Sequence, residues 1–238
     1  MRNKMNGAQL CARFAYKPYH LGRCGSSGKK DILLECIKSN TCKTFRESLN
    51  QYKTFYSYLK LISEKHSLGI LHPKVVEAYW IGNDLLKAFS RNDFHKWVEI
   101  YTELYDIKGS VSHLRNCFSK TSLPFIPHHA FQVFFSWKLT QDEGVDSLER
   151  VNNCLIRSGE IIDFSKKKIS IKSWRIQQKT NSLSMIPSRE TINYQTGFFQ
   201  NLQRGDNLAF HWKESCLRLS NRQLDQLRYY TKLVCYNL

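Results

Sequence analysis

The sequence lacks a long apolar run. No stretch of its 238 residues approaches the ~20 consecutive apolar residues that a membrane-spanning helix needs. Residues 1–7 include basic side chains, but no long apolar segment follows them, so the pattern of a secretory signal is missing. We therefore expect a cytoplasmic protein that is not inserted into a membrane.

The chain also contains no Cys-x-x-Cys pair, the spacing found in zinc ribbons and many iron–sulfur sites. Its 8 cysteines are scattered along the sequence rather than clustered. In a mid-sized chain without a secretion signal, this distribution argues against a disulfide framework. We expect most of the cysteines to be small buried side chains.

Acidic residues are scarce, because 20 Asp and Glu stand against 36 Lys and Arg, which gives a formal net charge of +16. Such a charge favours an anionic partner. The basic residues are nevertheless spread along the chain, as on a solvated surface, and their densest run is only 166–168. Trp174 and Tyr194 near basic residues leave nucleic-acid binding as a third hypothesis. No recognised nucleic-acid motif supports it, so nucleic acid is not the partner that we expect.

The first part of the chain has a helical pattern. Residues 8–16 indicate a short helix, and Pro18 together with the glycines and serines that follow predicts a loop over 17–28. Apolar residues then recur at intervals of three and four from 30 to about 119. We predict an all-helical domain over residues 1–140. Its clearest helices are expected over 72–86, with Pro73 in the first turn, and over 93–107.

The pattern changes after 141–146. Short alternating strands are predicted over 154–162 and 168–174, a third around 191–194, and a fourth that follows the turn at 204–206 and ends at His211. A last helix over 220–234 has Ser220 as its N-cap. The fold class is therefore α+β: an N-terminal helical domain, then a small β-barrel with a C-terminal helix over 150–238.

The helical domain offers one group of candidate site residues. Cys24 follows an arginine in the predicted loop, and neighbouring positive charge favours a thiolate. Glu77 and Asn83 lie among aromatic residues and need hydrogen-bond partners. His128 and His129 are adjacent, so at most one should face a given site. These residues could form the nucleophile, base and orienting group of an enzyme, or could bind a metal, and each also has a purely structural interpretation.

Several segments resemble, over nearly the whole chain, a bacterial family known from sequence. They are 13–16, 21–25, 75–83, 128–129 and 211–212. This resemblance implies no activity.

A second resemblance covers only 152–238. The segment Cys154-Leu155-Ile156-Arg157-Ser158-Gly159-Glu160-Ile161, a basic hairpin, and then Gly205-Asp206-Asn207-Leu208-Ala209-Phe210-His211 are similar to the HypC/HupF-type chaperones of nickel–iron hydrogenase maturation. The resemblance implies a small β-barrel with a trailing helix. It assigns the metal-handling cysteine, which opens the first strand, to Cys154 and its partner histidine to His211. Two features depart from the family pattern: Cys154 is internal rather than N-terminal, and Ser158 stands where the chaperones have proline.

The same resemblance implies a function in metalloprotein assembly rather than catalysis. The cargo would be iron with cyanide and carbonyl ligands, held transiently by a soft thiolate and an imidazole. The partner would be a hydrogenase large-subunit precursor or an iron-scaffold maturation protein, and a basic surface would help either to dock. This is the main functional hypothesis from the sequence.

Overall fold

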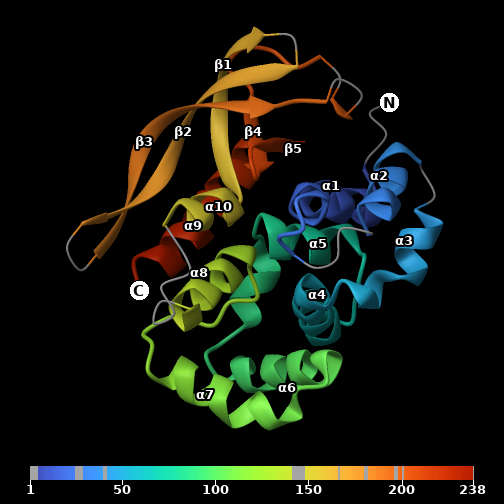
Figure 1. Ribbon diagram of the computed structural model, residues 1–238, viewed down its shortest axis with the longest axis vertical. Coiled ribbons are helices and arrows are strands. Elements are labelled where there is room, and N and C mark those ends of the chain that lie inside the picture. The colour runs from blue at the N-terminus through green and yellow to red at the C-terminus, as the bar shows by residue number, and fades with distance from the viewer. Residues whose placement is uncertain are drawn as a thin grey trace.

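The computed structural model describes residues 5–24, 29–39, 42–140, 148–165, 167–179, 182–195, 198–199 and 201–237. Helices come first, a β-barrel follows, and a helix ends the chain (Figure 1). The predicted α+β class is therefore confirmed. Among the described residues, no helix combines the length and the apolar character needed to cross a membrane.

The N-terminal part is built from short helices packed around an aromatic core. They are α1 (Gly7–His20), α2 (Lys30–Lys38), α3 (Lys43–Glu47), α4 (Lys53–His66), α5 (Pro73–Trp80), α6 (Asp93–Tyr105), α7 (Val111–Ser119), α8 (His129–Thr140) and α9 (Leu148–Cys154), with 3₁₀ turns η2 (Leu49–Gln51), η3 (Asp84–Ala88) and η4 (Lys108–Ser110).

Helix α1 runs through Pro18 to His20, so the prediction of a loop from residue 17 onward is wrong over its first residues. The helix ends at His20, and the chain turns away at Gly22, whose φ of 65° is left-handed and suits glycine. The Gly22 N–H bonds to the Tyr19 carbonyl at 3.1 Å, and the Arg23 N–H bonds to the Pro18 carbonyl at 2.8 Å. Burial of Pro18 and Tyr19 against the core holds this last turn in place. Residues 25–28 of the predicted loop lie outside the described residues.

The segment predicted as one helix over 72–86 is two pieces. Helix α5 starts at Pro73, with the Nδ1 atom of His72 accepting from the Lys74 N–H at 3.2 Å, and it stops at Trp80. Gly82 has a φ of 96°, and a Cβ atom there would overlap the ring of Tyr230. This close approach interrupts the helix, and the chain resumes as η3.

The barrel contains β1 (Arg157–Ser165), β2 (Lys168–Lys179), β3 (Ser182–Asn193), β4 (Asn207–His211) and β5 (Glu214–Arg218) in the order β1-β2-β3-β5-β4. Adjacent strands are antiparallel, except that β3 meets β5 in parallel at Asn193 and Glu214. Strand β5 was not predicted. It follows a tight turn in which Trp212 and Lys213 have φ values of 51° and 58°.

Strands β2 and β3 pair along their full length, well beyond the part of β2 that pairs with β1. They therefore form a hairpin that projects past the other strands (Figure 1). Strand β3 is much longer than the prediction around 191–194.

A small apolar cluster fills the barrel, and a larger one extends from α1 across the helical part to the C-terminal helix α10 (Asn221–Cys235). Helix α10 begins with the predicted N-cap: the Ser220 hydroxyl accepts from the Gln223 N–H, and Gln223 returns the bond in a capping box. Of the boundary expected between residues 140 and 150, the part at 141–147 lies outside the described residues, and α9 begins at Leu148.

The cysteines are mostly buried, as expected. A disulfide nevertheless joins Cys36 to Cys42 across the short connection between α2 and α3, with a Cα–Cα distance of 4.2 Å. This disulfide closes a local loop of the helical part and does not link distant parts of the fold.

Candidate metal centre

Three side chains able to bind a metal meet where the helical part contacts the barrel. His129, Cys154 and His211 each offer one ligand atom, and these atoms all lie within 4.8 Å of one another. His129 begins α8, Cys154 ends α9, and His211 ends β4. Cys154 and His211 are the pair that the chaperone resemblance assigned. His129 belongs to the other group of candidates, which the sequence places in the helical domain.

His211 is fixed by its backbone partner. Its side chain is buried, and its Nδ1 atom lies 2.7 Å from the Phe14 carbonyl oxygen. Because a carbonyl only accepts, Nδ1 carries the hydrogen and Nε2 is left with its lone pair. Nε2 makes no hydrogen bond within the described residues, although the backbone of Cys154 also lies close to the ring. Burial lowers the pKa of His211 to about 4, so the ring is neutral at pH 7 and able to bind a metal.

The Phe14 carbonyl can serve His211 because of the proline in α1. In an α-helix this carbonyl would accept from the N–H four residues later. That residue is Pro18, which has no N–H. The unusual proline inside α1 therefore leaves a carbonyl without its helical donor at the place where His211 binds.

His129 is also held neutral. Burial is the main cause that lowers its pKa well below the ordinary value, and the nearby His211 and His128 add to the effect. Its ring centroid lies 4.9 Å from that of Trp80 and 5.0 Å from that of His211. Its Nδ1 atom has no hydrogen-bond partner among the described residues. The aromatic surroundings keep water away from this side of the group.

Cys154 is half-buried and forms no disulfide. It ends a helix, so the prediction that it opens the first strand is wrong, and β1 begins only at Arg157. The helix persists because Asn152 anchors it to the barrel: its side chain donates to the Ile176 carbonyl at 2.9 Å and accepts from the Ile176 N–H at 2.7 Å. Next to it, the Trp212 N–H bonds to the Asn153 carbonyl at 2.9 Å, which ties the cysteine segment to the histidine segment.

The donor set suits a borderline or soft transition metal. One thiolate and two neutral imidazoles are ligands for zinc, iron or copper, and a fourth position would remain open to another ligand. Ligand atoms on one tetrahedral ion lie roughly 3.5 Å apart, as follows from metal–ligand bonds of about 2.0–2.3 Å.

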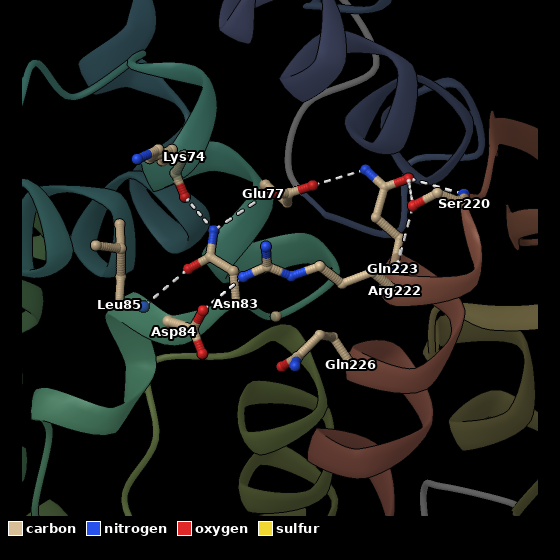
Figure 2. A pocket seen from close by; sticks show the side chains of 10 residues that line it. Lys74, Glu77, Asn83, Asp84, Leu85, Ser220, Arg222, Gln223 and Gln226 are labelled. Atoms are coloured by element: carbon tan, nitrogen blue, oxygen red, sulfur yellow. Dashed lines mark hydrogen bonds and ion pairs between the residues drawn. The ribbon is translucent and has the colours of Figure 1, made fainter.

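Glu77 and Asn83 lie elsewhere, at a pocket of about 330 Å³ between α5, η3 and α10 (Figure 2). The Asn83 amide nitrogen donates to the Lys74 carbonyl at 2.8 Å and to Glu77 at 3.3 Å, and its oxygen accepts from the Leu85 N–H at 3.0 Å. Gln223 of α10 donates to the other Glu77 oxygen at 2.6 Å. The polar atoms of this network satisfy one another, so Glu77 and Asn83 brace α10 against the helical part.

The remaining candidates of the helical domain are in different surroundings. His128 accepts from the Ala130 N–H at 3.1 Å through Nδ1, and its ring lies 5.6 Å from that of Tyr230. Burial raises the pKa of the Cys24 thiol to about 11, so the expected thiolate does not form. Arg23 lies over the Trp212 ring instead, at 5.6 Å. Of the alternative group of Cys24, Glu77, Asn83, His128 and His129, the structure brings Glu77 and Asn83 into one hydrogen-bond network and places His129 beside Cys154 and His211.

Trp174, which suggested base stacking, is buried, and its indole N–H donates to the Ser158 hydroxyl at 3.4 Å. Its ring is therefore not presented for stacking.

No curated protein and no solved structure matches the chain. A family of unknown function, DUF6390, matches residues 3–236, which agrees with the resemblance seen along nearly the whole sequence. The chain belongs to the DUF6390 family.

Proposed function

We propose that this protein is an accessory factor of nickel–iron hydrogenase maturation that carries iron with cyanide and carbonyl ligands on Cys154 and His211. The observation that supports the proposal is the convergence of these two side chains, which are far apart in sequence, with ligand atoms within 4.8 Å of each other and of His129. The similarity of residues 152–238 to HypC/HupF-type chaperones first suggested the same pair.

The chemistry of the group fits such a cargo. Low-valent iron prefers a soft thiolate, and a neutral imidazole can complete its binding without adding charge. Cyanide and carbonyl would fill the positions that the protein leaves open. The low pKa values of both histidines keep them ready to bind a metal at neutral pH.

His129 gives the carrier a third contact to its cargo. It comes from α8, so cargo held by all three residues would bridge the helical part and the barrel. Three protein ligands hold a metal more firmly than two, while the open position lets a partner begin the exchange. His129 would thus favour retention, and Cys154 and His211 would form the core of the carrier site.

The charge of the chain fits the proposed partners. With a formal net charge of +16, the protein would be attracted to an acidic hydrogenase precursor or iron-scaffold protein. This attraction would act mainly on the rate of encounter and would weaken as salt is added.

A complementation experiment tests the function. The gene is deleted in a host that makes a nickel–iron hydrogenase, and hydrogenase activity is measured after the wild type or a variant is returned. Cys154→Ala and His211→Ala should fail to restore activity while they accumulate as folded protein. Cys117→Ala is the matched control, because Cys117 is also half-buried but lies outside the metal group. Full activity in the deletion strain itself would refute the proposal.

A further inference from the structure

A second cavity of about 540 Å³ lies between α9 and the β2–β3 hairpin. Its walls come from four places in the chain: α9, the start of β1, the hairpin, and the turn after β4. Its charged lining residues are Glu149, Arg157, Arg175, Arg189, Glu190 and Lys213. The volume falls within the range of about 300–1,000 Å³ that small-molecule sites occupy.

One ion pair is built into the wall of this cavity. Arg157 is buried, and it binds Glu190 through both terminal nitrogens, with 2.8 Å between Nη2 and Oε2. It also donates to the Trp174 carbonyl at 2.8 Å. The pair is therefore a fixed part of the wall, and its charges cancel.

Three further basic residues line the cavity. Arg175, Arg189 and Lys213 are exposed, and no ion pair involves them within the described part of the chain. The residues that line the cavity include four basic and two acidic ones, Glu149 being the second acid, so their formal charge is +2. Arg189 pairs with Lys172 and therefore lies on the opposite face of the hairpin from Arg175 and Glu190, which leaves Arg175 and Lys213 as the exposed cations on which the inference rests. Several cations around one cavity concentrate anions there more strongly than the same charges spread over a convex surface.

One face of the hairpin carries several polar side chains. The register pairs Ser173 with Ser188 and Arg175 with Ile186, so Arg175 shares one face of the hairpin with Ser188 and Glu190. A guanidinium and a hydroxyl on this face are suitable donors for an oxyanion.

We infer that this cavity binds a small multivalent oxyanion, a carboxylate or phosphate compound with two or more negative charges. Such a ligand would neutralise the two exposed cations Arg175 and Lys213. A nucleic-acid strand fits less well, because two carboxylates interrupt the positive lining and the nearby Trp174 is buried rather than open for stacking.

The cavity adjoins the candidate metal centre. Asn152 and Asn153 line it and directly precede Cys154, and Lys213 lines it two residues after His211. An oxyanion bound there would contact the segments that carry two of the candidate metal ligands. The inference itself rests on the charge and shape of the cavity and does not depend on a bound metal.

The test is calorimetric titration of the full chain at low salt with two probes, citrate and pyrophosphate. At least one should bind with one-to-one stoichiometry, and the stronger of the two identifies the oxyanion as carboxylate or phosphate. Arg175→Gln/Lys213→Gln should weaken that binding about tenfold or more, since each tenfold step corresponds to about 1.4 kcal/mol. Both side chains are exposed, so the variant should fold normally.

Lys108→Gln/Arg228→Gln is the control, because it removes the same charge from exposed positions outside the cavity. It should keep the affinity within about twofold, a change that is small against the tenfold step. Binding of neither probe, or equal weakening in both double variants, would overturn the inference. Cys154→Ala should bind the oxyanion like the wild type even if the metal proposal fails, so the two proposals can fail separately.

Discussion

The Nδ1 atom of His211 lies 2.7 Å from the carbonyl oxygen of Phe14, 197 residues away in the chain. That carbonyl lacks its usual helical donor because Pro18 stands four residues later. A residue that interrupts the bonding of one helix thereby sets the tautomer of a candidate metal ligand in the barrel.

We expect Pro18→Ala to weaken metal binding although residue 18 touches no metal. The restored N–H would compete for the Phe14 carbonyl, and His211 would lose part of its orientation. Changes to such supporting hydrogen bonds reduce metal affinity about 10–100-fold. Titration with Co²⁺, followed by the thiolate-to-cobalt absorption band, measures the effect. An affinity equal to that of the wild type would show that the Phe14 bond does not position His211.

The metal-free protein should lose stability on mild acidification. The pKa values of His128 and His211 are lowered by burial to about 4, and that of His129 is lowered as well. Between about pH 6.5, where unfolded histidine titrates, and pH 4, the unfolded state therefore binds more protons than the folded state. The free energy of unfolding should fall as the pH drops through this window, by up to about 1.4 kcal/mol per pH unit for each histidine. Above about pH 6.5 the stability that the neutral histidines contribute should be fully present.

Urea unfolding of the metal-free chain at pH 7.5, 6.5, 5.5 and 4.5 measures this slope. His95 is exposed, so His95→Gln should leave the slope unchanged. A flat profile between pH 6.5 and 4.5 would mean that the three buried histidines do not remain neutral in the folded state.

Gly82→Ala should destabilise the protein by about 2–4 kcal/mol. The substitution combines a left-handed backbone, with φ at 96°, and a methyl group that would overlap the Tyr230 ring. Chemical denaturation gives the loss. Gly109→Ala is the control, because a Cβ atom there meets nothing within 4 Å. If both variants were equally stable, the close packing of α10 on Gly82 would be disproved.

Asn83→Ala distinguishes a structural network from an enzyme site. It removes three partly buried hydrogen bonds made by the buried Asn83 side chain, so the free energy of unfolding should fall by about 1–3 kcal/mol. Co²⁺ affinity should stay at the wild-type value, because the network is separate from the metal group. Weakened Co²⁺ binding in a folded variant would instead show that the Asn83 network is coupled to the metal group.

The sequence predicts the features that depend on local signals. The alternation that ends at His211 and the Ser220 N-cap lead to β4 and α10, since one follows from strand periodicity and the other from capping chemistry. Strand β5 is missed because its turn uses Trp212 and Lys213 at positive φ, where glycine or asparagine is the usual signal.

The site is formed by contacts between residues far apart in the sequence, which no local sequence pattern predicts. Cys154 and His211 are suggested by resemblance alone, and nothing in their spacing indicates that they approach each other. His129 is ambiguous because its histidine neighbour leaves open which ring faces inward. Pro18 is the one local signal with a bearing on the site, but only the fold shows that its missing N–H serves His211.

The most direct test of the central claim is infrared spectroscopy of the full chain, purified anaerobically from a host that makes nickel–iron hydrogenase. We expect cyanide and carbonyl bands together with bound iron in the wild type and in Cys117→Ala, and their loss in Cys154→Ala and His211→Ala. Wild-type protein without these bands, or bands that persist in both metal-site variants, would contradict it.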